Sequence, residues 1–175
     1  MTEILILVDE NDNQIGTGEK MAVHRAGTLH RCFSIFIVNS RGHLLLQKRA
    51  KSKYHSGGLW TNTCCSHPRD KESLEESIHR RLVEEMGFDC EMKEVFTFIY
   101  RAELDHGLTE HEYDHVYIGK YDGVISPNPE EADGYEWEDI ETIRKDIKTN
   151  SGRYTVWSKI AIEKLLEKYP DGIPV

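Results

Sequence analysis

The segment SHPRDKESLEESIHRRLVEEMGF, residues 66–88, fixes the central element of this chain, because it predicts an amphipathic helix over 72–86. Ser73 and Glu76 form the S-x-x-E pattern of a capping box, in which two side chains satisfy the free backbone amides at a helix start. Gly87 follows the predicted end, where glycine readily adopts the left-handed conformation that terminates helices. The helix is therefore bounded at both ends by local sequence.

One face of this helix combines apolar residues with a carboxylate. At about 100° per residue, Glu85 falls inside the apolar stripe, and Arg81 falls at its border one turn earlier. An inward carboxylate is costly unless it is paired or binds a metal. One interpretation is an Arg81–Glu85 ion pair at the rim of the core; the pattern favours the other, a functional carboxylate. The stripe consists of Leu74, Ile78, Leu82 and Met86.

Short apolar segments on both sides of the helix predict strands. Residues 33–39 and 43–49 predict a hairpin around the turn at 40–42. The order of strands, helix, strands and helix predicts an α/β or α+β domain with a mixed β-sheet. We expect strands at 4–8, 33–39, 43–49, 94–104, 112–121 and 135–138, a turn at 9–16, and helices at 72–86, 139–148 and 154–169.

The chain has the size and composition of one soluble domain, which we expect to span 1–175. Its 175 residues carry 22 basic and 31 acidic side chains, and the net charge of −9 argues against a general nucleic-acid binder. No apolar run approaches the ~18 residues of a membrane span, and the start MTEILILVDE lacks a basic region typical of signal peptides. The four cysteines form no C-x-x-C pair, so we expect reduced thiols and a cytoplasmic location.

A cysteine and three histidines are placed where they could share one site. Cys65 and His67 are two residues apart, so in an extended segment their side chains point to one side. His24 and His30 bracket a glycine-containing turn before the strand at 33–39. We expect the remaining side chains of these types to be structural: His43, His55, His79, His106, His111 and His115 as surface or satisfied histidines, and Cys32, Cys64 and Cys90 as small buried hydrophobes.

Acidic residues alternate along one predicted strand. Glu110, Glu112 and Asp114 would face the same side of it, where close like charges repel unless a cation lies between them. Together with the three histidines, Glu110 and Glu112 make a plausible site for a divalent transition metal or magnesium. We interpret Asp114 as an edge charge and not as a ligand.

Basic residues gather in KRAKSK, residues 48–53, within an otherwise acidic chain. Lys and Arg can hold phosphate oxygens through charge-assisted hydrogen bonds. On its own, however, this pattern favours a solvated edge hairpin protected by lysines. The role of Trp157 is also undecided by pattern. Its place on the predicted helix fits either a packing residue of the core or an aromatic wall that stabilises a cation.

The segment 66–88 resembles the Nudix box, G-x5-E-x7-R-E-U-x-E-E-x-G-U, in which U is apolar. The resemblance implies a Nudix fold, with a mixed β-sheet sandwiched between helices. Two positions differ from the box: Ser66 replaces the first Gly, and Arg81 replaces a Glu that helps Nudix hydrolases hold magnesium. The second difference counts against diphosphate hydrolysis. The matching residues are Glu72, Arg80, Glu84, Glu85 and Gly87.

Nearly the whole chain is similar to one branch of this family, the type 1 isopentenyl diphosphate isomerases. That branch tolerates Arg at the position of Arg81, so the second difference supports the resemblance. WTNTCCSHP followed by the altered box is far more specific than a Nudix box alone. The segments that carry the similarity are 19–34, 44–53, 60–68, 66–88, 110–119 and 153–157.

The resemblance implies a role for each matching residue. Cys65 matches the catalytic thiol, Glu112 the catalytic carboxylate, and Tyr100 a tyrosine that supports proton delivery. Glu85 matches the ligand of a magnesium ion that accompanies the substrate diphosphate, and Trp157 the aromatic wall over the hydrocarbon. The metal ligands would be His24, His30, His67, Glu110 and Glu112, and the cations around the diphosphate would be Lys20, Arg49, Lys53 and Arg81.

The expected activity is the interconversion of isopentenyl and dimethylallyl diphosphate by a 1,3-proton shift through a tertiary carbocation. This reaction needs Mg²⁺ with the substrate and one divalent metal (Mn²⁺, Zn²⁺ or Mg²⁺) at the His/Glu site, but no flavin or nicotinamide. We expect a small prenyl diphosphate as the only partner, without nucleic acid or membrane, and a monomer. The alternatives are a Nudix diphosphohydrolase acting on a nucleoside or prenyl diphosphate, and a non-catalytic metal- or nucleotide-binding module.

Overall fold

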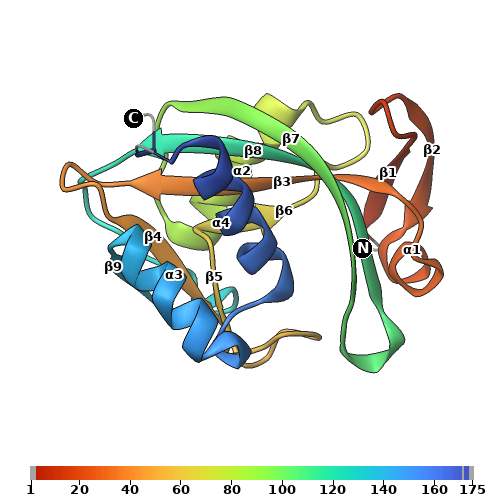
Figure 1. The fold of residues 1–175 in the computed structure, drawn as a ribbon. Coiled ribbons are helices and arrows are strands. Elements are labelled where there is room, and N and C mark those ends of the chain that lie inside the picture. Colours follow the sequence, from red (N-terminus) through yellow and green to blue (C-terminus); the bar gives the residue numbers. More distant parts are fainter. Residues whose placement is uncertain (1–2, 171, 174–175) are drawn as a thin grey trace.

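A mixed β-sheet forms the centre of the molecule in the computed structural model, which describes residues 3–170 and 172–173 (Figure 1). Its middle strand, β3 (His30–Val38), runs parallel to β8 (Thr109–Lys120) and antiparallel to β1 (Ile4–Val8) and β6 (Cys64–Ser66). The other strands are β2 (Gln14–Glu19), β4 (Leu44–Arg49), β5 (Trp60–Thr61), β7 (Met92–Glu103) and β9 (Ala132–Glu138).

The predicted hairpin between 33–39 and 43–49 is only partly confirmed. The chain does turn back, but β3 and β4 pair through Val38 and Leu44 alone. The short strand β6 takes the adjoining edge of β3, from Phe33 to Ile35, and β4 pairs instead with β9 and β5. The two halves of the sheet therefore diverge, and β6 brings its residues next to the start of β3.

Helices cover both faces of the sheet, as the fold class requires (Figure 1). Alternate residues of β3 face opposite cores: Phe33, Ile35 and Ile37 pack with α2 (Leu74–Met86). Phe36 and Val38 pack with α3 (Ile140–Thr149) and α4 (Val156–Lys168). The period of two in a strand thus builds two apolar layers, and the prediction of a sheet between helices is confirmed.

Helix α2 begins and ends where its local signals place it. The Ser73 and Glu76 side chains form the predicted capping box. Gly87 ends the helix with φ of 75°, and a Cβ at this position would overlap the carbonyl oxygen of Ser126. Only glycine satisfies both conditions, because other residues rarely adopt positive φ and have no room here.

Two elements near the N-terminus were not predicted. Strand β2 begins inside the segment that we assigned to a turn at 9–16, and α1 (Lys20–Ala26) follows it directly. Helix α1 is only seven residues long, too short for a clear apolar period, and Glu19 caps its start through the amides of Met21 and Ala22. This helix matters for the site, because it carries His24.

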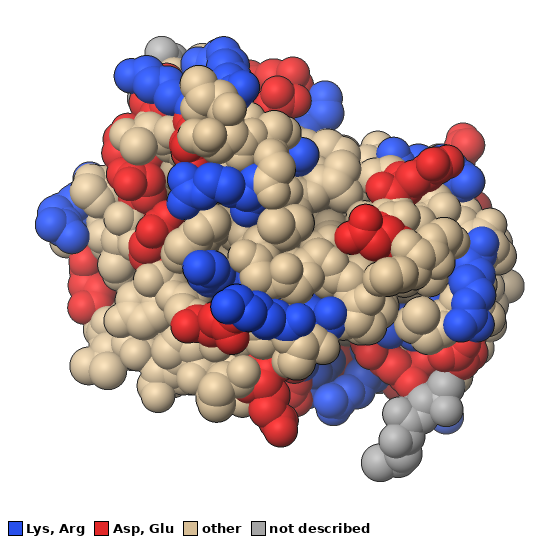
Figure 2. All heavy atoms as spheres, turned by 90° about the horizontal axis from the view of Figure 1, so that it is seen from below, with Lys and Arg blue, Asp and Glu red and all other residues tan. Residues whose placement is uncertain are grey.

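The long β7–β8 hairpin projects beyond the end of the sheet, and α1 lies beside it (Figure 1). On the face seen in Figure 2, acidic and basic side chains are interspersed among uncharged residues. Among the described residues, none of the helices is long and apolar enough to cross a membrane.

Candidate active site

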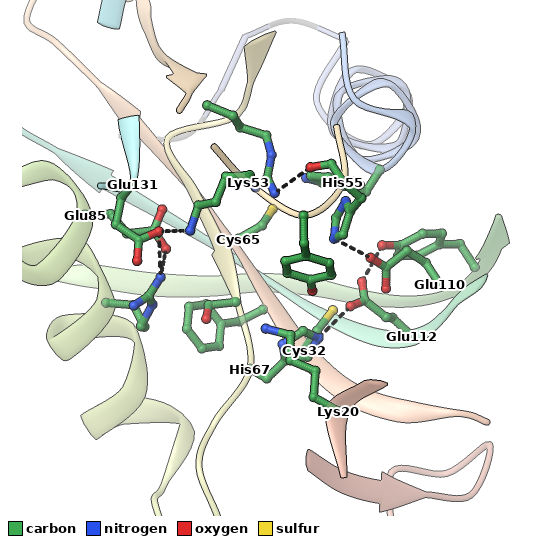
Figure 3. A pocket seen from close by; sticks show the side chains of 17 residues that line it. Lys20, Cys32, Lys53, His55, Cys65, His67, Glu85, Glu110, Glu112 and Glu131 are labelled. Atoms are coloured by element: carbon green, nitrogen blue, oxygen red, sulfur yellow. Dashed lines mark hydrogen bonds and ion pairs between the residues drawn. The ribbon is translucent and has the colours of Figure 1, made fainter. Parts of the chain in front are cut away.

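A cavity of about 70 Å³ opens where β6, β8, α2 and the loop 50–59 meet. Figure 3 shows its plan: Glu85 and Glu131 lie at one end, Glu110 and Glu112 at the other, and Cys65 lies between them. Nearly all side chains to which we assigned a role line it. They are Lys20, Arg49, Lys53, Cys65, His67, Arg81, Glu85, Tyr100, Glu110, Glu112 and Trp157.

The five predicted metal ligands come together at one end of the cavity. One nitrogen or oxygen atom from each lies within 4.8 Å of every other, and all five residues are buried. Helix α1, strand β3, the segment after β6 and strand β8 each contribute to this group, which we call the His/Glu cluster. It consists of His24, His30, His67, Glu110 and Glu112.

Backbone carbonyls set the orientation of two of these histidines. Nδ1 of His24 lies 2.7 Å from the Lys20 carbonyl oxygen, and Nδ1 of His30 lies 2.8 Å from that of Thr28. Because a carbonyl only accepts, Nδ1 carries a hydrogen in both rings, and Nε2 is the atom that presents a lone pair when the ring is neutral. This is the arrangement that metal-bound histidines use.

Acceptor atoms face one another inside the cluster. His24 Nε2 lies 3.1 Å from Glu110 Oε2, and His30 Nε2 lies 3.5 Å from Glu112 Oε1. The two Nε2 atoms and Glu110 Oε2 are buried without a hydrogen-bond partner. A lone pair directed at a carboxylate needs a cation between them, so the cluster fits a divalent metal that accepts nitrogen and oxygen ligands.

Burial and neighbouring charges set the protonation of the cluster. Burial lowers the pKa of His67 to about 4, which keeps its ring neutral. Burial would raise the pKa of Glu112, but the neighbouring His30 and His67 side chains outweigh it and hold the pKa well below its usual range. Burial and the charge of Glu112 raise the pKa of Glu110. Neutral imidazole and ionised carboxylate are the forms that bind a metal.

Tyr100 contacts the same carboxylate from the neighbouring strand. It lies opposite Glu112 in the β7–β8 register, and its hydroxyl donates a hydrogen bond to Glu112 Oε2. Burial and the charge of Glu112 raise the pKa of Tyr100 well above its usual value, so the phenol keeps its proton. Both oxygens of Glu112 are therefore engaged, since His67 Nε2 lies 2.9 Å from Oε1.

The thiol of Cys65 faces the cavity from β6, on the same side as His67, as the spacing predicted. Burial and the charge of Asp114 raise its pKa well above the usual value, so the resting group is a neutral thiol. Asp114 itself corrects an expectation. It is not an edge charge but is 1% exposed, because β8 lies between β3 and β7, and burial with the charge of Glu112 raises its pKa to about 7.

Opposite charges meet at the other end of the cavity, which we call the Arg81 end. Arg81 pairs with Glu85 one turn away on α2 and lies 3.4 Å from Glu131. Glu131 also pairs with Lys53, and Gln47 donates to Glu85 at 2.8 Å. The Arg81–Glu85 pair that we weighed as the structural interpretation is thus present, and the same Glu85 faces the cavity.

The basic segment 48–53 divides between the cavity and the surface. Arg49 lies over the ring of Trp157, with its guanidinium carbon 5.1 Å from the ring centre, and Lys53 lines the cavity. Lys51 is exposed, whereas Lys48 lies over Trp60. The edge-hairpin interpretation therefore fits only part of the segment. Lys20, from α1, adds a further cation to the cavity and pairs with Glu3 at 2.9 Å.

Trp157 forms part of the cavity wall, and its indole nitrogen donates to Thr61 at 3.0 Å. His55, which we expected to be structural, packs edge-on against this ring at 5.5 Å and lies 3.9 Å from Glu110. Burial and the charge of Arg49 lower the pKa of His55 to about 3. Its position two residues after Lys53 was the only sequence signal. Sequence reasoning also missed the cavity-lining residues Cys32, Phe33, Tyr54, Ser66 and Glu131.

Comparison with known proteins places this architecture. The family model described as the NUDIX domain matches residues 28–158. A Deinococcus radiodurans crystal structure shares the fold with a TM-score of 0.77 at 20% identity, covering 93% of this chain and 98% of that one. A MutT protein from Methanosarcina mazei does so with a TM-score of 0.66 at 18% identity, covering 82% and 96%.

Curated relatives are far more similar in sequence. Isopentenyl-diphosphate Delta-isomerase 2 of Photorhabdus laumondii is 53% identical over 94% of this chain and 93% of its own length. Isopentenyl-diphosphate Delta-isomerase of Burkholderia multivorans is 47% identical over 100% and 96%. The chain therefore belongs to the Nudix family and, within it, to the isopentenyl-diphosphate Delta-isomerases.

Proposed function

We propose that this chain interconverts isopentenyl and dimethylallyl diphosphate by a metal-assisted 1,3-proton shift. The names of its relatives support this reaction, and so does the similarity over nearly the whole length. The observation that carries the proposal is the single cavity lined by Cys65, Glu112 and Trp157. Two proton-handling groups and an aromatic face are what such a shift requires.

The chemistry explains the need for two such groups. An unactivated alkene is a very weak base, and a proton added to its terminal carbon leaves a tertiary carbocation. Removing a proton from the neighbouring methylene then forms the internal double bond. We assign these two steps to Cys65 and Glu112, one delivering a proton and the other accepting one. No electrons are exchanged, so the reaction calls for neither flavin nor nicotinamide.

The surroundings of Glu112 suit it to this work. Tyr100 donates to one of its oxygens, and the buried phenol keeps its proton. We assign the His/Glu cluster as the site of a resident divalent ion: Mn²⁺, Zn²⁺ or Mg²⁺. Once bound, such an ion would offset the charge of Glu112 and polarise its carboxyl group.

The Arg81 end suits a diphosphate that arrives with Mg²⁺. Lys20, Arg49, Lys53 and Arg81 supply four cations around one cavity, each able to make charge-assisted hydrogen bonds to phosphate. Glu85 is the carboxylate that we assign to the accompanying Mg²⁺. This end lacks the second glutamate that the Nudix box would place at Arg81, which argues against activation of water for hydrolysis.

Trp157 is assigned to the hydrocarbon. A desolvated cation over a tryptophan face gains about 2 kcal/mol or more. The hydrogen bond to Thr61 holds the indole in place, and the neutral ring of His55 packs against it. The wall thus contributes an aromatic face and no positive charge from His55 at neutral pH.

All these side chains come from one chain, so we propose that a monomer is sufficient for catalysis. Its four free cysteines, including the thiol at the centre of the site, fit a reducing compartment such as the cytoplasm. Gel filtration at assay concentrations tests the first point. A protein whose active site is shared between two subunits would elute as a dimer and would lose activity on dilution.

The function is tested by giving the pure protein isopentenyl diphosphate and Mg²⁺, without flavin, and following acid-labile dimethylallyl diphosphate. A parallel reaction measures phosphate released from nucleoside and prenyl diphosphates. We expect allylic product and no hydrolysis. Hydrolysis without allylic product would instead indicate a Nudix diphosphohydrolase, and neither activity would indicate a binding module.

A further inference from the structure

A buried hydrogen-bond chain reaches the sulfur of Cys65 from behind the cavity wall. Ser34 Oγ lies 3.1 Å from Cys65 Sγ and donates to Asp114 Oδ2 at 2.7 Å. Ser34 and Asp114 are each 1% exposed, and neither of them lines the cavity. Neither residue can therefore touch a substrate held in that cavity, but both are connected to the Cys65 thiol, which faces the cavity.

The sulfur is held from a second direction by Asn62. Cys65 Sγ lies 3.0 Å from Asn62 Oδ1, to which it donates. Asn62 Nδ2 donates to the backbone oxygens of Ile35 and Cys64, so the amide has one fixed orientation. Asn62 Oδ1 can only accept from the thiol. Ser34 has one hydroxyl hydrogen, which goes either to Asp114 Oδ2 or to Cys65 Sγ, and its oxygen lies 3.1 Å from the sulfur in both cases.

Core stability does not explain Asp114. The buried Oδ1 of its carboxyl group has no hydrogen-bond partner, and an unsatisfied buried polar group costs about 1–3 kcal/mol. The next inward-facing positions of β8, Val116 and Ile118, are apolar and fully packed. The hydrogen bond from Ser34 connects this costly side chain to the sulfur of Cys65.

We propose that Ser34 is a positioning residue for Cys65 and that Asp114 acts through Ser34. Asp114 fixes the rotamer of Ser34, and Ser34 and Asn62 together fix the sulfur against the substrate. This inference rests on the proposed isomerase function, in which Cys65 is a proton-handling group. A displacement of about 1 Å in such a group can cost 100-fold in rate.

The test compares kcat and KM for isopentenyl diphosphate in wild type and variants. We expect Ser34→Ala to lower kcat about 30-fold and to change KM less than threefold, because Ser34 is remote from the diphosphate. Asp114→Val should behave like Ser34→Ala. Asp114→Asn keeps an oxygen that accepts from Ser34 and should retain at least a third of kcat.

Two controls separate positioning from general loss of structure. Ser77→Ala removes an equally buried hydroxyl from α2, where it donates to the Leu74 carbonyl oxygen, and should leave kcat within twofold. The double variant Ser34→Ala/Asp114→Val should be no slower than the slower single variant, because both changes break one chain of contacts.

The outcomes are distinguishable. An active wild type with a Ser34→Ala variant of unchanged kcat would overturn this inference alone, as would additive losses in the double variant. A loss of kcat in Ser77→Ala equal to that in Ser34→Ala would also overturn it. A wild type that forms no dimethylallyl diphosphate would overturn the proposed function and this inference with it.

Discussion

The two ends of the cavity carry similar numbers of carboxylates but neutralise them differently. At the Arg81 end, Glu85 and Glu131 are paired with the cations Arg81 and Lys53. In the His/Glu cluster, Glu110 and Glu112 face the Nε2 atoms of His24 and His30, whose Nδ1 hydrogens are turned away toward backbone carbonyls. One end is electrically satisfied as it stands, and the other needs a cation.

This difference separates two kinds of metal site. The His/Glu cluster has the donor atoms and the fixed side-chain orientations that a site for a resident ion needs. The Arg81 end can bind Mg²⁺ only when an anion displaces part of its ion pairing. We therefore expect the first ion to remain through purification and the second to exchange with the substrate. Cys65 lies between the two ends (Figure 3), so substitutions there, and at each end, should have separable effects.

The largest effect is expected at the thiol. Cys65→Ala should lower turnover by at least about 1,000-fold, because it removes one of the two proposed proton-handling groups. Both ends should keep their functions, seen as unchanged resident metal by elemental analysis and unchanged melting temperature. Cys64→Ala, the adjacent buried cysteine, is the matched control. More than a tenth of wild-type turnover in Cys65→Ala would contradict the assignment.

The next largest effect is expected on the metal content of the His/Glu cluster. His67→Asn removes one of the five proposed ligands and should weaken metal affinity at least about tenfold, measured by elemental analysis after dialysis. His79→Asn, on the exposed side of α2, should keep full metal content. An unchanged stoichiometry in His67→Asn would remove this residue from the ligand set.

A smaller effect is expected at the Arg81 end. Arg81→Gln removes a charged donor that we assign to the diphosphate and should raise KM about 30-fold, the equivalent of one charge-assisted hydrogen bond. Resident metal should be unaffected, which is the opposite of the His67→Asn result. Lys51→Gln, an exposed base of the basic segment 48–53, provides the control. If Arg81→Gln lost the resident metal, the two ends would not be independent.

The pH dependence of Cys65 alkylation tests the same thiol without substrate. Its pKa is raised by burial, so the thiolate fraction at pH 7 is below that of an ordinary thiol and grows with pH. The rate with iodoacetamide, followed by peptide mass spectrometry, should rise about tenfold per unit from pH 7 to 9. A plateau below pH 8 would show that the cavity stabilises the thiolate instead.

Local signals explain what the sequence could predict. The capping box and Gly87 placed α2, and alternation along strands correctly put Cys65 beside His67 and Glu110 beside Glu112. Both signals depend on neighbours a few residues away. The family resemblance, and not periodicity, supplied Tyr100, Trp157 and Lys20, because their relation to the site depends on distant segments.

The predictions that were wrong or missing concern residues whose positions depend on distant segments of the chain. Whether Asp114 lies at an edge depends on β7 pairing beside β8, which its own segment does not encode. His55 reaches the cavity because the loop 50–59 turns inward through Ser56 and Gly58, both with positive φ. Helix α1 is held by its cap and its contacts with β8, and its seven residues carry too little pattern to be recognised.

The most direct test of the account is to run the reaction in D₂O with wild type, Cys65→Ala and Glu112→Gln, and to follow the products by NMR. Wild type should form dimethylallyl diphosphate with one solvent deuteron in its new methyl group, while neither variant forms product. Product without deuterium, or near-normal turnover in either variant, would contradict a proton shift between these two side chains.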